Sequence, residues 1–186
     1  MDLSTPLGDE VLSLSAGNRV TLSGIVYTAR DEAHLEMMRH GIPFDPAGAV
    51  VYHCGPVIKD DRVIAAGPTT SARMNKLSGF LFDAGVRALI GKGGMDVTVT
   101  EQLRGRAVYL AFTGGCAALA AARMELEGVF FPELGMAEAV WAIRLDRLPL
   151  VVGIDSCGRN LFAEVQARAE AAGGRSGDRS SNTFSK

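Results

Sequence analysis

The sequence predicts a single α/β domain built on a mixed sheet and followed by an unstructured tail. Short apolar runs rich in β-branched residues alternate with segments of helical periodicity, which is typical of α/β folds. Some runs follow one another across a polar turn with no helix between them, so antiparallel strand neighbours are also expected. The chain has 186 residues, 47% of them hydrophobic, enough for one domain with a core. We place the domain at residues 1–167 and the tail, which has little to bury, at residues 168–186.

The first half of the chain predicts three strands and a helix. Residues 19–27 (RVTLSGIVY) are typical of a strand. Residues 29–40 are rich in helix formers, and Gly41 is a suitable C-cap. Residues 49–54 and 62–66 predict two short strands. The polar turn at residues 59–61 separates them, so we expect them to pair as a hairpin.

The second half predicts further alternation. Met74, Leu77, Leu81 and Ala84 recur at spacings of three and four, so one helix is expected from Ser71 onward. Strands are predicted at residues 86–90, 107–112, 141–145 and 148–154, with helices at 96–103 and 116–124. The second of these helices is mostly alanine, which indicates close packing against a neighbour.

Charge and hydropathy exclude several classes of protein. The formal net charge is −2, which gives no electrostatic reason to expect nucleic acid or an anionic membrane surface as a partner. The N-terminus is not typical of a secretory signal, and no apolar stretch is long enough to span a bilayer. We therefore expect a cytoplasmic protein.

The three cysteines, Cys54, Cys116 and Cys157, are far apart and form no paired motif. Neither a disulfide framework nor a metal site held by this chain alone is expected, because such sites need clustered ligands. Buried or incidental thiols are the favoured interpretation.

Two cations directly follow predicted strands, where α/β folds tend to bind ligands. Arg30 lies between the first strand and the first helix, and a guanidinium there can hold a carboxylate at two points. The alternative is a surface arginine paired with Asp31 or His34. Lys92 lies among glycines that allow a ligand to approach the backbone. A nucleotide-binding loop is not indicated, because Gly93 occupies the position where that motif needs Ser or Thr.

A third candidate segment combines a hydroxyl with a cation. Gly67 and Pro68 form a turn, and Thr69 follows it. If a helix begins near Thr69, then Thr69 and Arg73 project from the same side one turn apart, beside backbone N–H groups that can bind an anion. A simple capping turn with an exposed arginine explains the pattern equally well.

Together these segments resemble the β subunit of class I fumarate hydratase and of L(+)-tartrate dehydratase. Four stretches appear in the family's order and reach about Phe162: YTARDEAH, GPTTSARM, IGKGG and FPELGMAEAVW. The sequence departs from the fumarase-type pattern at Asn75, where an aspartate would be expected after Met74.

The resemblance implies a swivelling β/β/α domain with three layers and a mixed sheet. It also implies a [4Fe-4S] cluster that is bound by a partner α subunit, not by this chain, in a hetero-oligomer of α2β2 type. Arg30, Arg73 and Lys92 resemble the cations that bind the substrate carboxylates. Thr69 resembles the threonine proposed as the catalytic base, although it could instead only hydrogen-bond the substrate.

The function expected from the resemblance is the reversible hydration of fumarate to L-malate, with activity only in the presence of the α subunit. The same-class alternative is the β subunit of L(+)-tartrate dehydratase, and the sequence does not decide between these substrates. An alternative of another class is a stand-alone regulatory module that binds a dicarboxylate.

Overall fold

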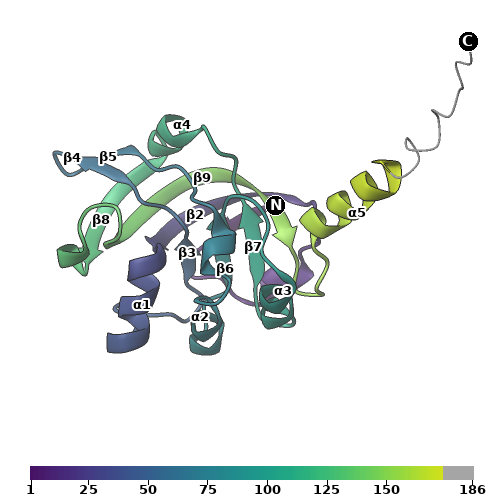
Figure 1. Ribbon diagram of the computed structural model, residues 1–186. Helices are drawn as coiled ribbons and strands as arrows, with labels where there is room; N and C mark the ends of the chain where they lie inside the picture. Colours follow the sequence, from purple (N-terminus) through teal and green to yellow (C-terminus); the bar gives the residue numbers. More distant parts are fainter. Residues whose placement is uncertain (174–186) are drawn as a thin grey trace, which may run out of the picture.

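The computed structural model describes residues 1–173, and its main feature is a mixed seven-stranded sheet. The strands follow the order β1-β2-β3-β6-β7-β9-β8, and β2 also pairs with β9. This extra pairing closes β2, β3, β6, β7 and β9 into a small barrel (Figure 1). The strands are β1 (Asp2–Ser4), β2 (Arg19–Thr28), β3 (Val50–Tyr52), β6 (Ala88–Gly91), β7 (Val108–Ala111), β8 (Met124–Phe130) and β9 (Val140–Ile154).

The strand directions confirm the predicted mixed α/β class. Strands β1, β2, β3, β6 and β7 are parallel to their neighbours in that series, whereas β9 runs antiparallel to β2, β7 and β8. The finer expectation of a three-layer swivelling domain stays a prediction.

Alternate residues of the central strands supply two separate cores. Val50, Tyr52 and Ile90 belong to the core on one face, and Val51 and Leu89 belong to the core on the other. The second core includes buried residues of the helices α1 (Asp31–His40), α2 (Gly79–Ala84) and α3 (Val97–Leu103), which lie on one side of the strands in Figure 1. The buried strands therefore carry apolar residues at successive positions, as parallel strands covered on both faces do.

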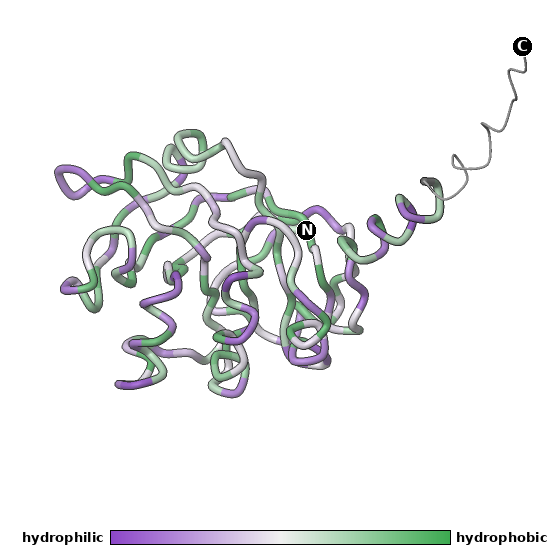
Figure 2. The backbone as a smooth tube through the Cα atoms, viewed as in Figure 1, coloured by the Kyte–Doolittle hydropathy of each residue, from purple (hydrophilic) through white to green (hydrophobic). Residues whose placement is uncertain are grey.

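The predicted hairpin between residues 49–54 and 62–66 is wrong. Strand β3 pairs in parallel with β2 and β6, and the true hairpin joins β4 (Val57–Lys59) to β5 (Arg62–Ala65). Asp60 and Asp61 make its turn with φ of 50° and 54°, a left-handed pair that suits a two-residue hairpin. The tip is strongly hydrophilic in Figure 2. The sequence did not predict β4, because this strand has only three residues and they are largely exposed.

The single helix expected from Ser71 to Ala84 is interrupted. A 3-10 turn, η2 (Ser71–Met74), is followed by α2 only from Gly79. The Ser78 hydroxyl donates to the Met74 carbonyl at 2.8 Å, which stabilises the break. Met74 and Leu81 are nevertheless buried, so the apolar spacing correctly identified these two side chains as part of the core.

The alanine-rich segment also differs from its prediction. Helix α4 (Ala117–Ala121) is a short helix, with Ala120 and Ala121 buried and Leu119 75% exposed. Met124, the last residue of the predicted helix, instead begins β8, which pairs with β9. The two strands expected at residues 141–145 and 148–154 are one continuous strand, β9.

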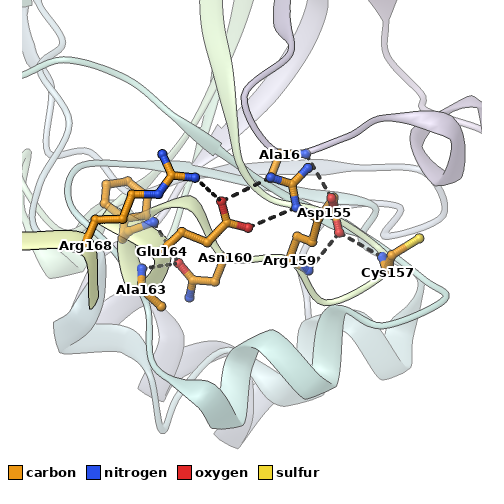
Figure 3. A network of polar contacts seen from close by, with 9 residues as sticks. Ala16, Asp155, Cys157, Arg159, Asn160, Ala163, Glu164 and Arg168 are labelled. Carbon is orange, nitrogen blue, oxygen red and sulfur yellow. Dashed lines mark hydrogen bonds and ion pairs between the residues drawn. The ribbon is translucent and has the colours of Figure 1, made fainter. Parts of the chain in front are cut away.

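Helix α5 (Leu161–Gly173) extends into the predicted tail through residues 168–173, and residues 174–186 lie outside the described part. The helix leaves the barrel at one end (Figure 1). Figure 3 shows the network at its start. Asn160 Oδ1 accepts a hydrogen bond from the Phe162 N–H, buried Asp155 accepts one from the Ala16 N–H, and Arg159 pairs with Glu164. The remaining elements are the 3-10 turns η1 (Asp9–Ser13) and η3 (Pro132–Leu134).

Within residues 1–173, none of the helices combines the length and the apolar character needed to cross a membrane.

Candidate functional site

The carboxyl ends of β2, β3, β6 and β7 share one edge of the sheet, because these four strands are parallel in series. Arg30 follows β2, His53 follows β3, and Lys92 directly follows β6. Thr113 lies two residues beyond the end of β7. The topology thus brings together residues from distant parts of the chain, as predicted for Arg30 and Lys92.

Thr69 is held between two of these strand ends by backbone hydrogen bonds. The Thr69 N–H donates to the His53 carbonyl at 2.7 Å, and the Lys92 N–H donates to the Thr69 carbonyl at 3.1 Å. The Ser71 N–H donates to the Lys92 carbonyl at 3.0 Å. Residues 69–71 therefore run beside the end of β6, which places Thr69 next to Lys92.

One of the two interpretations of this segment, a helix that begins near Thr69 and carries Arg73 one turn later, is wrong. Thr70 is extended, with φ of −67° and ψ of 112°, and the 3-10 turn begins only at Ser71. The strand-like pairing with Lys92 competes with helix formation here, because both would use the same backbone groups. Arg73 therefore reaches the site from the end of a short 3-10 turn.

Arg73 is held by Asp31 in an ion pair between the 3-10 turn and the first turn of α1. The Arg73 side chain remains 47% exposed, so its other guanidinium edge is open to a ligand. The alternative partners considered for Arg30 were Asp31 and His34, but Asp31 pairs with Arg73 instead.

Arg30 has a different carboxylate partner. Its Nε lies 3.2 Å from Glu138 Oε1, and Glu138 Oε2 accepts a hydrogen bond from the Glu32 N–H at 3.2 Å. The arginine side chain also lies against Gly55, where an added Cβ would stand 2.8 Å from Arg30 Nη1. Glu138 is only 19% exposed and positions Arg30.

Lys92 is the cation of the cluster that has no carboxylate partner among residues 1–173. Its side chain lies over the turn after β7, because a Cβ added at Gly114 would stand 3.0 Å from Lys92 Cδ. Three cations against two carboxylates leave a local positive charge. The cluster is therefore suited to an anionic ligand even though the whole chain is slightly acidic.

Two buried histidines lie close to these residues. His34 Nδ1 is 2.7 Å from the Arg30 carbonyl, and the rings of His34 and His53 are 5.4 Å apart. Since a carbonyl can only accept, His34 Nδ1 carries a proton. Burial lowers the pKa of His34 and lowers the pKa of His53 further, with His34 adding to the effect on His53. Both rings are therefore neutral near pH 7. The sequence offered no sign of them beyond two isolated histidines.

The described residues do not fit an iron–sulfur cluster. Within residues 1–173, no group of three or more His, Cys, Asp or Glu side chains is arranged to hold a metal ion. Cys54 is buried, and desolvation raises the pKa of its thiol to about 12. Cys116 is partly exposed and Cys157 is exposed.

The charges of the cluster are suited to a small dicarboxylate. Arg30 and Arg73 present planar guanidinium groups that match carboxylate geometry, and Lys92 adds a point charge. The backbone of Thr69 pairs with that of Lys92, and the Thr69 hydroxyl forms no hydrogen bond with another described residue. It is therefore free to contact a ligand held by the cations.

Several known proteins are similar to this chain over most of its length. A Methanocaldococcus jannaschii protein provisionally named L(+)-tartrate dehydratase subunit beta is 42% identical over 173 residues, which are 86% of this chain and 89% of that protein. The Escherichia coli K12 L(+)-tartrate dehydratase subunit beta is 35% identical over 87% of this chain and 86% of its own length. A Geobacillus stearothermophilus protein provisionally named fumarate hydratase class I is 39% identical over 88% of this chain, which spans only 34% of that protein.

The profile of the fumarase C-terminus family matches residues 1–165, nearly all of the domain. All four candidate residues, from Arg30 to Lys92, fall within the match. The chain therefore belongs to the fumarase C-terminus family.

Proposed function

We propose that this chain is the β subunit of a hydro-lyase and that, with an α subunit, it catalyses the reversible hydration of fumarate to L-malate. The observation that carries the proposal is the meeting of Arg30, Thr69 and Lys92 at one edge of the sheet. Arg73 joins them through its ion pair with Asp31. These groups match the needs of a substrate with two carboxylates and a proton to be moved.

The cations have two tasks in such a reaction. Removing a proton beside a carboxylate builds negative charge on that carboxylate in the transition state, and fixed donors stabilise it there. The same cations hold a flexible diacid in one orientation, which lowers the entropic cost of reaching the transition state. Asp31 and Glu138 hold the two arginines in place before the substrate arrives.

Thr69 is the candidate for proton transfer. A neutral hydroxyl is a weak base, so its alkoxide would need stabilisation from a nearby cation. Lys92 is the nearest candidate, because its backbone pairs with that of Thr69. If Lys92 does not supply that stabilisation, Thr69 contributes a hydrogen bond to the substrate.

The proposed site is one half of an active site. An α subunit would carry the [4Fe-4S] cluster, which supplies a Lewis acid for the substrate hydroxyl, and the assembly would be of α2β2 type. The family resemblance supports this division and the swivelling three-layer form of the domain.

L(+)-tartrate dehydration is the second candidate activity. It is favoured by the names of the M. jannaschii and E. coli relatives, which the match covers over most of their lengths. The two reactions need the same carboxylate clamp, so the cations do not distinguish them. A stand-alone dicarboxylate-binding module is less well supported, because it would leave Thr69 without a role.

The test is a coupled assay of the complex prepared with its α subunit under anaerobic conditions. L-Malate, fumarate and L(+)-tartrate are offered side by side, and the chain alone serves as the control. We expect turnover of fumarate and L-malate by the complex and none by the chain alone. Turnover of tartrate alone would select the second candidate. Tight dicarboxylate binding by the chain alone, with an inactive complex, would favour the binding module.

A further inference from the structure

A buried chain of hydrogen bonds runs beneath the two loops that carry Thr69 and Lys92. His53 Nδ1 lies 2.8 Å from Ser71 Oγ, and the Tyr109 hydroxyl lies 3.0 Å from the same atom. The Tyr109 hydroxyl also lies 2.8 Å from the Gly93 carbonyl. His53, Ser71 and Tyr109 are fully buried, so each unmade bond would leave a polar group without water.

The donor and acceptor of every hydrogen bond in this series follow from its last acceptor, the Gly93 carbonyl. The Gly93 carbonyl can only accept, so it takes the single proton of the Tyr109 hydroxyl. Ser71 then donates its proton to Tyr109, because two lone pairs would otherwise meet. The remaining lone pair of Ser71 accepts the Nδ1 proton of His53. The chain is complete only when His53 carries its proton on Nδ1.

This assignment leaves His53 Nε2 as a lone pair in the protein interior. Neither it nor His34 Nε2 has a hydrogen-bond partner among the described residues. A second proton on His53 would place a buried charge without a counter-ion, so the ring is held in one neutral tautomer. In this tautomer, His53 Nδ1 always carries the proton that it donates to Ser71 Oγ.

The same series of hydrogen bonds sets the distance between the loop that carries Thr69 and the loop that carries Lys92. A Cβ added at Gly91 would stand 1.7 Å from Ser71 Oγ and 3.1 Å from the Tyr109 hydroxyl. The Ser71 side chain therefore occupies the space that Gly91 leaves open. Ser71 also donates its backbone N–H to the Lys92 carbonyl, so its side chain and main chain together fix residues 69–71 beside Lys92.

We propose that His53 is a positioning residue that acts through Ser71 and Tyr109 to hold the Thr69 hydroxyl at its working distance from Lys92. This inference rests on the proposed function and deepens it. His53 does not touch the substrate, because its side chain is buried. A shift of about 1 Å in a reacting group can cost about 100-fold in rate, so loss of the chain lowers turnover more than binding.

The first test compares two substitutions of His53 in the complex with the α subunit. An asparagine amide nitrogen takes the place of Nδ1, whereas leucine has no donor. We expect His53→Leu to lower kcat about 10- to 100-fold with KM changed less than about threefold, and His53→Asn to recover most of kcat. Equal activity of the leucine variant and the wild type, or an asparagine variant as slow as the leucine variant, would overturn the proposal.

The second test separates positioning from general stability. Tyr109→Phe removes a link of the chain, and Tyr52→Phe is a matched control. Tyr52 is also fully buried, and its hydroxyl donates to a backbone carbonyl, that of Ala66, at 2.7 Å. We expect similar losses of thermal stability from both variants but a lower kcat only from Tyr109→Phe. Equal kcat values in the two variants would contradict the positioning role.

A readout without turnover distinguishes failure of this inference from failure of the proposed function. In the full chain, the backbone amide signals of Ser71 and Lys92 should move in His53→Leu and return toward wild type in His53→Asn. Unmoved signals would refute the positioning role whatever the enzyme does. The amide signals could instead move as expected while the wild-type complex is inactive on L-malate, fumarate and L(+)-tartrate. That result would overturn the proposed function, and with it the positioning of Thr69 for catalysis.

Discussion

Asp31 and Arg73 form an ion pair that connects the first turn of α1 to η2, the 3-10 turn that follows Thr69 in the sequence. Their side chains are 27% and 47% exposed, so the pair is partly screened by solvent and adds little to stability. Its effect is on orientation, because it holds the guanidinium through one nitrogen and leaves nearly half of the arginine side chain exposed. A substrate carboxylate would then meet an arginine already in place.

Arg73→Ala should cripple the complex without unfolding it. Removing a charged hydrogen-bond donor from a substrate carboxylate costs about 1.5–3 kcal/mol, so kcat/KM should fall about 10- to 150-fold. The midpoint of thermal unfolding should change little, since Arg73 is half exposed. Steady-state kinetics and a thermal melt check this.

Arg39→Ala is the matched control for that variant. Arg39 pairs with Glu36 at the other end of α1 and is 60% exposed. It should keep wild-type kinetics. Full activity in the Arg73 variant would remove the carboxylate-clamp assignment.

Thr69→Ala and Thr69→Ser distinguish the two roles open to the hydroxyl. If Thr69 takes the proton, the alanine variant should lose mainly kcat, and the serine variant should keep much of it. If Thr69 only binds, the alanine variant should mainly raise KM. Thr70→Ala is the control, because Thr70 is the exposed neighbour. Unchanged kcat and KM in Thr69→Ala would exclude both roles.

Gly114→Ala should disturb Lys92 without destabilising the fold. The added Cβ would stand 3.0 Å from Lys92 Cδ, and a flexible side chain can move away at small cost. We expect a raised KM and an unchanged midpoint of thermal unfolding. Gly128→Ala is the control, because its Cβ would meet nothing within 4 Å. Equal kinetics in both variants would show that Lys92 does not depend on its place over the turn.

The sequence predicted the site residues that local patterns identify, but not the contacts that depend on the order of the strands. Arg30 and Lys92 could be located because each directly follows an apolar strand, and local patterns identify strand ends. Their counter-ions could not be predicted, since Glu138 meets Arg30 from more than a hundred residues away. The His53–Ser71 contact depends likewise on strand order, which periodicity does not encode.

The errors in the fold have a similar cause. No helix begins near Thr69 because residues 69–71 pair with Lys92, a tertiary contact that overrides a good helical pattern. The hairpin was misassigned because β3 is buried on both faces and so gave no alternation to mark its parallel partners. Composition alone suggested a tail where α5 continues to Gly173.

The buried histidines predict a stability that falls as the pH is lowered. Burial lowers the pKa of His34 and of His53 in the folded chain, whereas an unfolded histidine titrates near about pH 6.5. Below that value the unfolded chain binds protons that the folded chain does not. Their contribution is therefore fully present above about pH 6.5 and is lost as the pH falls toward the folded pKa values, by up to about 1.4 kcal/mol per pH unit for each histidine.

Urea unfolding of the full chain between about pH 7.5 and pH 5.5 measures this slope, in a range where most carboxylates stay ionised. His53→Asn should remove the share of one histidine. A free energy of unfolding that stays level down to pH 5.5 would mean that the two rings accept protons in the folded state. The single neutral tautomer that His53 needs in order to donate to Ser71 would then not hold in that range.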